Sequence, residues 1–202
     1  MKIGPKYKIA RRLGAEIFEK TQTQKFAIRQ SQKKDGDSKF KQRTDFGKQV
    51  LEKQKVRFTY GIMERQFSKY VKNIINKQAG NPEEKLFQIL ESRLDNVVLR
   101  AGFAKTRFMA KQMVGHGHIM VNGKKTDIPS CQVSVGDKIT IRPGSSKSVM
   151  FADLSERLKN ITIPSWLKVD LDKKEITVQG KPVKAPGESL LNLSAVIQYY
   201  KR

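Results

Sequence analysis

The sequence has 202 residues and a formal net charge of +22, because 41 lysines and arginines outnumber 19 acidic residues. Its hydrophobic fraction of 38% is below the roughly 45–50% of an ordinary globular chain, so one or two domains with small cores are expected. No run approaches the roughly 18 apolar residues of a membrane helix, and the first residues lack the apolar core of a secretory signal. Because Cys131 is the only cysteine and there are two histidines, we expect a reducing compartment, no cofactor and no structural metal.

The positive charge is spread over several parts of the chain. Residues 1–80 contain 21 basic and 7 acidic residues, and residues 92–142 contain 9 and 3. A disordered basic tail would leave the rest of the chain neutral, and a membrane surface would favour one basic amphipathic helix. A polyphosphate backbone suits charge that is distributed in this way. The composition therefore predicts nucleic-acid binding, with DNA and RNA both open at this point.

Residues 1–44 contain few apolar residues and no sustained period. They include a polar, charged run from Ser31 to Arg43. Such a segment cannot bury enough surface to order itself, so we expect an extended basic arm with at most one short helix that orders against a partner. A flexible solubilising tail is the alternative.

Residues 45–75 carry apolar side chains at helical spacing, and Gly61 divides the pattern into two helices. Between residues 48 and 77 the only acidic residues are Glu52 and Glu64. This shortage of acidic partners argues against i,i+4 ion pairs that would neutralise the basic face. We therefore predict a helical RNA-binding domain over residues 45–91, against which residues 186–202 pack.

Three short helices are expected next. An Asn-Pro start signal predicts a helix over residues 82–91. Ser92, followed three residues later by Asp95, resembles a capping signal for a second helix, which stops at Gly102. A third helix starts at Thr106 and ends near residue 115.

After residue 117 the apolar period becomes two, which predicts strands. Asn122 and Gly123 are the residues of a type I′ hairpin turn. A helix is expected around residues 151–158, and further strands at residues 138–142, 166–169 and 175–178. The predicted class is α+β: an extended basic arm, a helical lobe, and a lobe of two short helices with a small, mostly antiparallel sheet. We assign residues 92–152 to the last lobe and residues 153–185 to additional strands and a connector.

Several segments resemble a known family. Four segments resemble the S-four (S4) RNA-binding domain: Arg93–Gly102, Thr106–Ala110, Gly117–Gly123 and Val135–Asp137. Four further segments, outside that domain, resemble the bacterial ribosomal protein S4 family: Ile3–Gly14, Asp45–Phe67, Pro164–Asp170 and Val196–Arg202. Together the matching segments cover nearly the whole chain in order.

This resemblance implies a structural protein of the small ribosomal subunit, not an enzyme, that binds ribosomal RNA (rRNA) directly and nucleates assembly by clamping a helical junction. It also implies a place beside ribosomal protein S-five (S5), near the path by which messenger RNA enters, with a role in translational accuracy. The host is a cytoplasmic ribosome, with a plastid ribosome as the alternative. Some members hold zinc with an N-terminal cysteine cluster, which this sequence lacks, so it is similar to the metal-free form.

Folded RNA is recognised largely by shape, through phosphates and 2′-hydroxyls. A rigid helix pair supplies fixed cations, arginine suits bidentate phosphate contact, and Thr106 opens a helix whose N-terminus favours anions. The candidate rRNA-binding residues are Lys6, Lys8, Arg11, Arg12, Lys53, Lys55, Arg57, Arg65, Tyr70, Arg93, Arg100, Lys105, Thr106, Arg107, Lys111, His116, His118, Asn122 and Lys124. For messenger RNA the candidates are Lys48, Lys53 and Lys55.

Catalytic interpretations are weaker. His116 and His118 suggest a metal or acid-base site, but only Asp127 and Cys131 lie near them in the sequence. Asp95 belongs to an Arg-Leu-Asp run of the kind around the catalytic aspartate of pseudouridine synthases, but no segment remains for a catalytic domain. Capping, or pairing with a neighbouring arginine, is the expected role of Asp95. A stand-alone RNA-binding stress factor would not explain the matching terminal segments.

Overall fold

The computed structural model describes residues 3–34, 44–77, 80–146, 148–159, 161–170, 172–183 and 191–202. It combines helices with an antiparallel sheet, which confirms the predicted α+β class. Its contacts divide the chain into two units, Met1–Leu86 with Ala185–Arg202, and Phe87–Lys184. The finer domain limits given above stay a prediction. Most of the polar run at 31–43, and residues 186–190 of the expected C-terminal segment, lie outside the described residues.

The start of the first unit contains more helix than the sequence predicts. It forms α1 (Lys6–Leu13), a 3-10 helix η1 (Glu19–Thr21) and α2 (Gln24–Lys34), so the expectation of at most one short helix is wrong. The reason is a small apolar cluster in which Ala10, Phe18 and Phe26 are buried. Three side chains spaced eight residues apart bring the two helices together without producing a sustained helical period.

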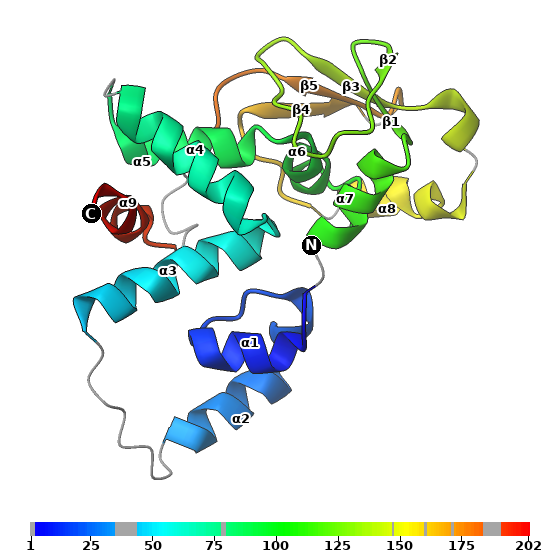
Figure 1. The fold of residues 1–202 in the computed structure, drawn as a ribbon. Coiled ribbons are helices and arrows are strands. Elements are labelled where there is room, and N and C mark those ends of the chain that lie inside the picture. The colour runs from blue at the N-terminus through cyan, green and yellow to red at the C-terminus, as the bar shows by residue number, and fades with distance from the viewer. Residues whose placement is uncertain are drawn as a thin grey trace. The chain divides into compact units, whose positions relative to one another are not determined.

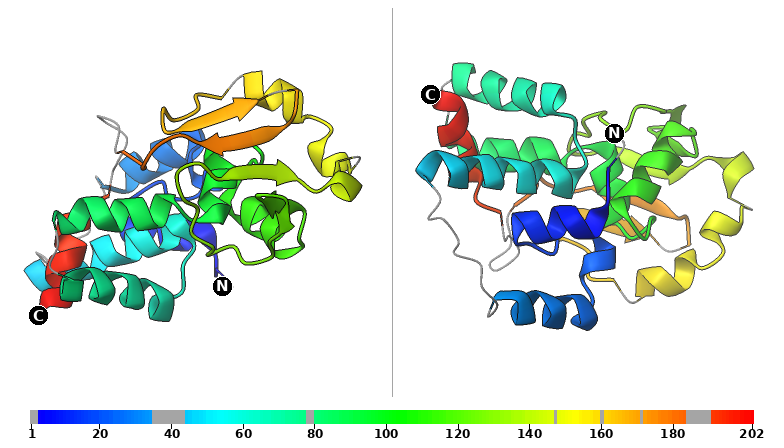
Figure 2. Two further views of the ribbon diagram at one scale, coloured as in Figure 1. Left: turned by 90° about the horizontal axis from the view of Figure 1, so that it is seen from above. Right: turned by 60° about the horizontal axis from the view of Figure 1, so that its bottom comes forward.

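Three longer helices complete the first unit: α3 (Asp45–Tyr60), α4 (Glu64–Lys77) and α9 (Leu193–Lys201). Gly61 ends α3 with a left-handed φ of 60°, as the sequence predicts. The C-terminal helix α9 packs against α3 and α4, and both views of Figure 2 show it beside α3. It buries Leu193, Val196 and Ile197, and the Tyr200 ring meets Phe67 edge-on at 6.2 Å between centroids.

Helix α5 (Pro82–Glu91) begins in the first unit and ends in the second. The other helices of the second unit follow it in the chain. They are α6 (Leu94–Arg100), α7 (Arg107–Gly115) and α8 (Leu154–Lys159), with 3-10 turns η2 (Pro143–Ser145) and η3 (Val149–Phe151). The predicted Ser92–Asp95 cap is wrong. Arg93, not Ser92, occupies the cap position. Its side chain makes no capping bond because a guanidinium has no acceptor atom, and Asp95 binds this guanidinium.

The sheet of the second unit has five antiparallel strands in the order β2-β1-β3-β5-β4. They are β1 (Ile119–Val121), β2 (Lys124–Lys125), β3 (Lys138–Ile141), β4 (Leu167–Asp170) and β5 (Glu175–Val178). Asn122 and Gly123 join β1 to β2 with φ of 50° and 77°, the signs that a type I′ turn requires. Figure 1 shows α6 and α7 side by side against one face of this sheet. The core lies between them, from Leu94, Val97 and Met113 to Ile139 and Ile176.

Candidate nucleic-acid interface

The second unit presents a cationic face at the junction of α6 and α7, the two helices that pack most closely in this unit. Thr106 fixes the start of α7, because its Oγ1 accepts a hydrogen bond from the backbone N–H of Met109 at 3.1 Å. A capped start of this kind holds the first turn rigid and directs its N–H dipoles outward. Lys105 lies beside it with a 59% exposed side chain, 3.5 Å from Asp153.

Arg93 is not part of that surface. It is 2% exposed, and its Nε and Nη2 donate to the two Asp95 carboxylate oxygens at 3.0 and 2.7 Å. The backbone of residues 93–95 runs along residues 129–132, where Leu94 N–H bonds the Cys131 carbonyl at 2.8 Å. Because the side chain is buried, Arg93 is not presented at the surface of the helix pair as the sequence analysis expected. The pair also gives Asp95 the arginine-pairing role expected from the sequence.

A second buried carboxylate, that of Glu91, organises the arginines that do reach the surface. Glu91 is 1% exposed, and Arg100 binds it with Nε and Nη2 at 2.9 and 3.0 Å. Asn96 Nδ2 donates to Glu91 at 2.6 Å, and its Oδ1 accepts from Arg107 Nη1. Arg100 and Arg107 are therefore held side by side and half-buried by groups from α5 and α6.

Lys111 completes this face from the next turn of α7. Its Nζ lies 3.6 Å from Asp95 Oδ2. Burial lowers the pKa of Lys111, and the charges of Arg93 and Arg107 lower it further, while Asp95 acts in the opposite direction. An approaching anion favours the charged form of Lys111, because it offsets both the burial and the neighbouring cations that lower the pKa.

The turn after α7 brings the two histidines together. Their rings stack at 6.0 Å between centroids with planes 28° apart, and His118 Nδ1 lies 2.9 Å from Ser145 Oγ. His116 is exposed. No group of three or more histidine, cysteine, aspartate or glutamate side chains that could hold a metal occurs within the described ranges.

Asn122 is engaged in the turn itself. Its Nδ2 donates to Asp137 Oδ1 at 2.8 Å, and its Oδ1 accepts from the backbone N–H of Lys138 at 2.9 Å. These bonds tie the β1–β2 turn to the start of β3, which gives the residue a structural role that the sequence analysis did not assign. Lys124, by contrast, is exposed.

One exposed aromatic on α7 was missed. Phe108 is 67% exposed and lies one turn from Lys111 on the same helix. A helical wheel could have found it, because the buried positions Ala110, Met113 and Val114 leave position 108 on the outer face. An exposed ring among cations is a surface on which an unpaired base stacks.

The central helices of the first unit neutralise much of their own charge. Lys53 Nζ lies 2.8 Å and Arg57 Nη1 3.3 Å from Glu64, and Lys55 Nζ lies 2.6 Å from Glu52. None of these three pairs is of the i,i+4 kind that the sequence analysis argued against, yet two acidic residues still hold three cations on the described helices. Lys53 is only 7% exposed, with its Nζ 4.4 Å from the centre of the Tyr199 ring, so its side chain is withdrawn from solvent.

The other candidates of the first unit lie nearer to solvent. Lys8, Arg11, Arg12 and Arg65 are exposed, whereas Lys6 and Tyr70 are half-buried. Lys6 Nζ lies 5.8 Å from the centre of the Phe18 ring, and Tyr70 accepts a hydrogen bond from Gln66 at 3.0 Å. Lys48 has a 65% exposed side chain and a weak surface pair with Asp45 at 3.2 Å.

Glu64 joins three helices at the centre of that network. Tyr200 Oη donates to Glu64 Oε1 at 2.8 Å, alongside the two cations. Burial raises the pKa of the Glu64 carboxyl, but hydrogen bonds from Lys53 and Tyr200 and the nearby charges outweigh it, so the pKa lies below 4.5. Burial and the bond to Glu64 raise the pKa of Tyr200, which keeps its hydroxyl proton available for donation.

Comparison with known proteins covers the whole chain. The sequence model described as "Ribosomal protein S4/S9 N-terminal domain" matches residues 1–91, and the one described as "S4 domain" matches residues 92–139. A protein of Herpetosiphon aurantiacus named "Small ribosomal subunit protein uS4" is 42% identical over 98% of both chains. A protein with the same name from a Sulfurihydrogenibium species is 43% identical over 98% of this chain and 95% of its own. Another from Cupriavidus pinatubonensis is 39% identical over 98% of both chains.

Among the residues that the structure describes, no helix is long and apolar enough to cross a bilayer.

Proposed function

The chain belongs to the ribosomal protein S4 family, and from this premise we propose that it is a primary rRNA-binding protein that nucleates assembly of the small subunit at a helical junction. Family membership makes it a structural protein of the small ribosomal subunit and not an enzyme, in agreement with the sequence analysis. Its place of action is then the ribosome.

The observation that carries the proposal is the prearranged cationic face of α6 and α7. Arg100, Arg107 and Lys111 are positioned by Glu91, Asn96 and Asp95, which lie beneath them. A long side chain loses conformational entropy when it binds, and a chain already held by its neighbours loses less. Rigid guanidinium groups also match phosphate oxygens in a bidentate geometry. Such a face recognises the shape of a folded RNA backbone, which is what a primary binder requires.

We base three further roles on the resemblance to the family. The proposal includes contact with ribosomal protein S5, a position near the path of messenger RNA and an effect on translational accuracy. Of the three candidate lysines we keep Lys48 for the messenger contact, because Lys53 is buried and Lys55 is paired with Glu52. A surface lysine of this kind attracts RNA without reading its sequence.

The proposal is tested with the full-length protein and purified small-subunit rRNA in the absence of other ribosomal proteins. A primary binder forms a saturable complex and protects one helical junction from chemical probing. Arg107→Ala combined with Lys111→Ala should weaken the complex by about tenfold or more, because each lost charged hydrogen bond counts for about 1.5–3 kcal/mol.

The matched control removes two exposed lysines elsewhere in the second unit, Lys168 and Lys181. Lys168→Ala with Lys181→Ala changes the net charge equally, so it should weaken binding much less. Binding that appears only after other small-subunit proteins are added would disprove the primary role. Equal losses in both double variants would show that α6 and α7 are not the interface.

A further inference from the structure

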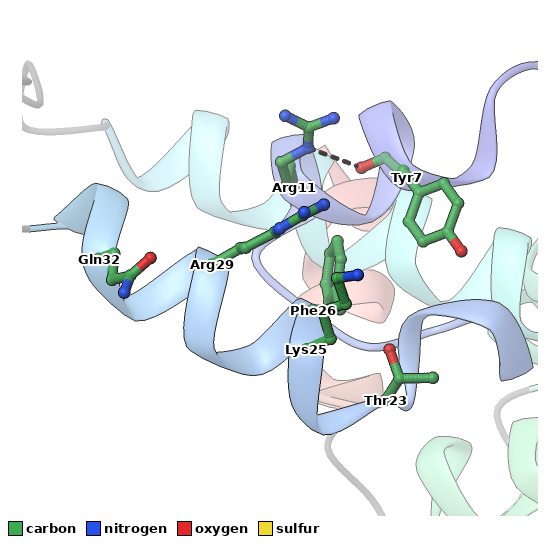
Figure 3. A pocket seen from close by; sticks show the side chains of 7 residues that line it. All are labelled: Tyr7, Arg11, Thr23, Lys25, Phe26, Arg29 and Gln32. Carbon is green, nitrogen blue, oxygen red and sulfur yellow. Dashed lines mark hydrogen bonds between the residues drawn. The ribbon is translucent and has the colours of Figure 1, made fainter.

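A cavity of about 710 Å³ lies between α1 and α2 of the first unit (Figure 3). Two aromatic rings contribute to its lining, Tyr7 from α1 and Phe26 from α2, with centroids 5.8 Å apart and planes inclined by 39°. Phe26 is 7% exposed and anchored in the apolar cluster of this region, whereas Tyr7 is 47% exposed. The volume lies within the roughly 300–1,000 Å³ range of small-molecule sites.

Three cations share the lining with these rings: Arg11 from α1, and Lys25 and Arg29 from α2. No acidic side chain lines the cavity, and none of the three forms an ion pair with any residue that the structure describes. Arg11 Nε donates to the backbone carbonyl of Tyr7 at 3.3 Å, and Figure 3 shows its terminal nitrogens turned away from that bond. Among the described residues, the cavity therefore combines ring faces with positive charge that has no acidic partner.

This combination selects the chemistry of the ligand. A purely apolar ligand would leave three cations facing it without counter-charge, and a bare anion would leave the exposed Tyr7 ring unused. A nucleotide satisfies both, because its base stacks on an aromatic ring and its phosphate binds arginine and lysine. Thr23 and Gln32 at the rim add a hydroxyl and an amide that can bond a base or a sugar.

We propose that this cavity holds one unstacked nucleotide of the bound RNA strand, with its base on the Tyr7 ring. The proposal rests on the RNA-binding function and names a subsite for it. Lys25 and Arg29 lie one helical turn apart on α2, and Arg11 approaches from the other helix. Three separated cations suit the successive phosphates of a strand better than the single phosphate of a free mononucleotide.

The test measures binding of fluorescein-labelled RNA pentanucleotides to the full-length protein. One probe carries adenine at every position, and the other has an abasic site at the centre. Tyr7→Ala should weaken binding of the adenine probe by about 5- to 100-fold, the range of base–aromatic stacking. It leaves the Arg11 bond in place, because that bond goes to the main-chain carbonyl. Tyr7→Phe should bind within about twofold of the parent, because it keeps the ring face.

The abasic probe separates stacking from charge. With it, Tyr7→Ala and the parent protein should bind equally weakly, whereas Arg29→Gln should weaken both probes. Phe46→Ala is the matched control, because Phe46 is a similarly exposed aromatic, 49%, on α3 outside the cavity. It should bind both probes as the parent does, and thermal unfolding should show all variants folded.

Several results would overturn the proposal. If Tyr7→Ala weakens binding of both probes equally, no base stacks on Tyr7. If Tyr7→Ala weakens binding of neither probe, the cavity does not bind the RNA. Adenosine 5′-monophosphate that displaces the adenine probe at equal concentration would identify a free nucleotide as the ligand. If these tests fail while rRNA binding stays sensitive to Arg107→Ala with Lys111→Ala, only the subsite is lost. If rRNA binding itself is absent, the proposed function fails.

Discussion

The guanidinium of Arg93 and the carboxylate of Asp95 form a buried pair inside the second unit, with side chains 2% and 7% exposed. Removing one partner of a buried pair strands the other charge and costs about 3–5 kcal/mol. We therefore predict that Arg93→Ala lowers the free energy of unfolding by an amount in this range, measured by urea denaturation. Lys105→Ala, which alters a 59% exposed side chain, should change it by less than about 0.5 kcal/mol.

The opposite result would be an Arg93→Ala protein as stable as the parent that binds rRNA poorly, which would make Arg93 an RNA ligand after all.

The sequence allowed the pairing of Arg93 with Asp95 to be expected, since the two residues lie two positions apart. It could not reveal that the backbone of residues 93–95 bonds to residues 129–132, or that Glu91 and Arg100, nine positions apart, meet at 2.9 Å. Residue type predicts charge, whereas exposure depends on tertiary contacts.

Phe108 gives a second prediction at this scale, because a 67% exposed ring contributes little to the core. Phe108→Ala should leave the unfolding midpoint unchanged and weaken rRNA binding by about 1–3 kcal/mol through the loss of one stacked base. The control is Ile128→Ala, which removes another exposed apolar side chain, 59%, from the same unit. Equal affinities for the two variants would show that Phe108 is only a solvated surface residue.

Between elements, Glu64 on α4 connects α3 through Lys53 and Arg57 with α9 through Tyr200. Its pKa lies below 4.5 in the folded protein, so the stability it contributes is present above the pKa of the unfolded chain and is lost as the pH falls through the folded value. We predict that Glu64→Gln is less stable than the parent at pH 7. The difference should stay constant down to about pH 4.5 and shrink below it.

Urea unfolding of both proteins between pH 3 and pH 7 measures this difference, and other carboxylates cancel in the comparison. Tyr200→Phe is the companion variant, because it removes one hydrogen bond from Glu64 while keeping the ring against Phe67. A difference that grows on acidification would mean that Glu64 is protonated more easily in the folded state. The contacts of Glu64 with Lys53, Arg57 and Tyr200 would then disfavour the charged carboxylate.

Elements with strong local signals were predicted well from the sequence. Gly61 separated α3 from α4, and Asn122 with Gly123 formed the expected turn. Helices α1 and α2 were missed because they are stabilised by packing of Phe18 and Phe26 rather than by a long amphipathic period. The sheet order was also beyond local signals, since β3 pairs with both β1 and the distant β5.

For the whole molecule, the net charge of +22 overstates the number of cations available to RNA. Lys53, Lys55, Arg57 and Arg93 have carboxylate partners within the protein. Composition predicted the class of partner, because long-range attraction depends on total charge. The set of contacting residues depends instead on which cations reach the surface, as Arg100 and Lys111 do although each has a carboxylate partner. Only the folded structure separates these groups.

The salt dependence of rRNA binding counts the phosphate contacts that those cations make. With about 6–10 phosphates neutralised, affinity should fall by about three to five decades between 50 and 200 mM salt, on an estimate derived from duplex DNA. The slope of log affinity against log salt is measured by filter binding with purified small-subunit rRNA. Arg107→Ala and Lys111→Ala should each reduce it by about one contact. Arg93→Ala, corrected for its unfolded fraction, should leave it unchanged, because the Arg93 side chain is only 2% exposed and binds Asp95. A flat response in the parent protein would mean that shape and stacking, and not phosphate contacts, hold the RNA.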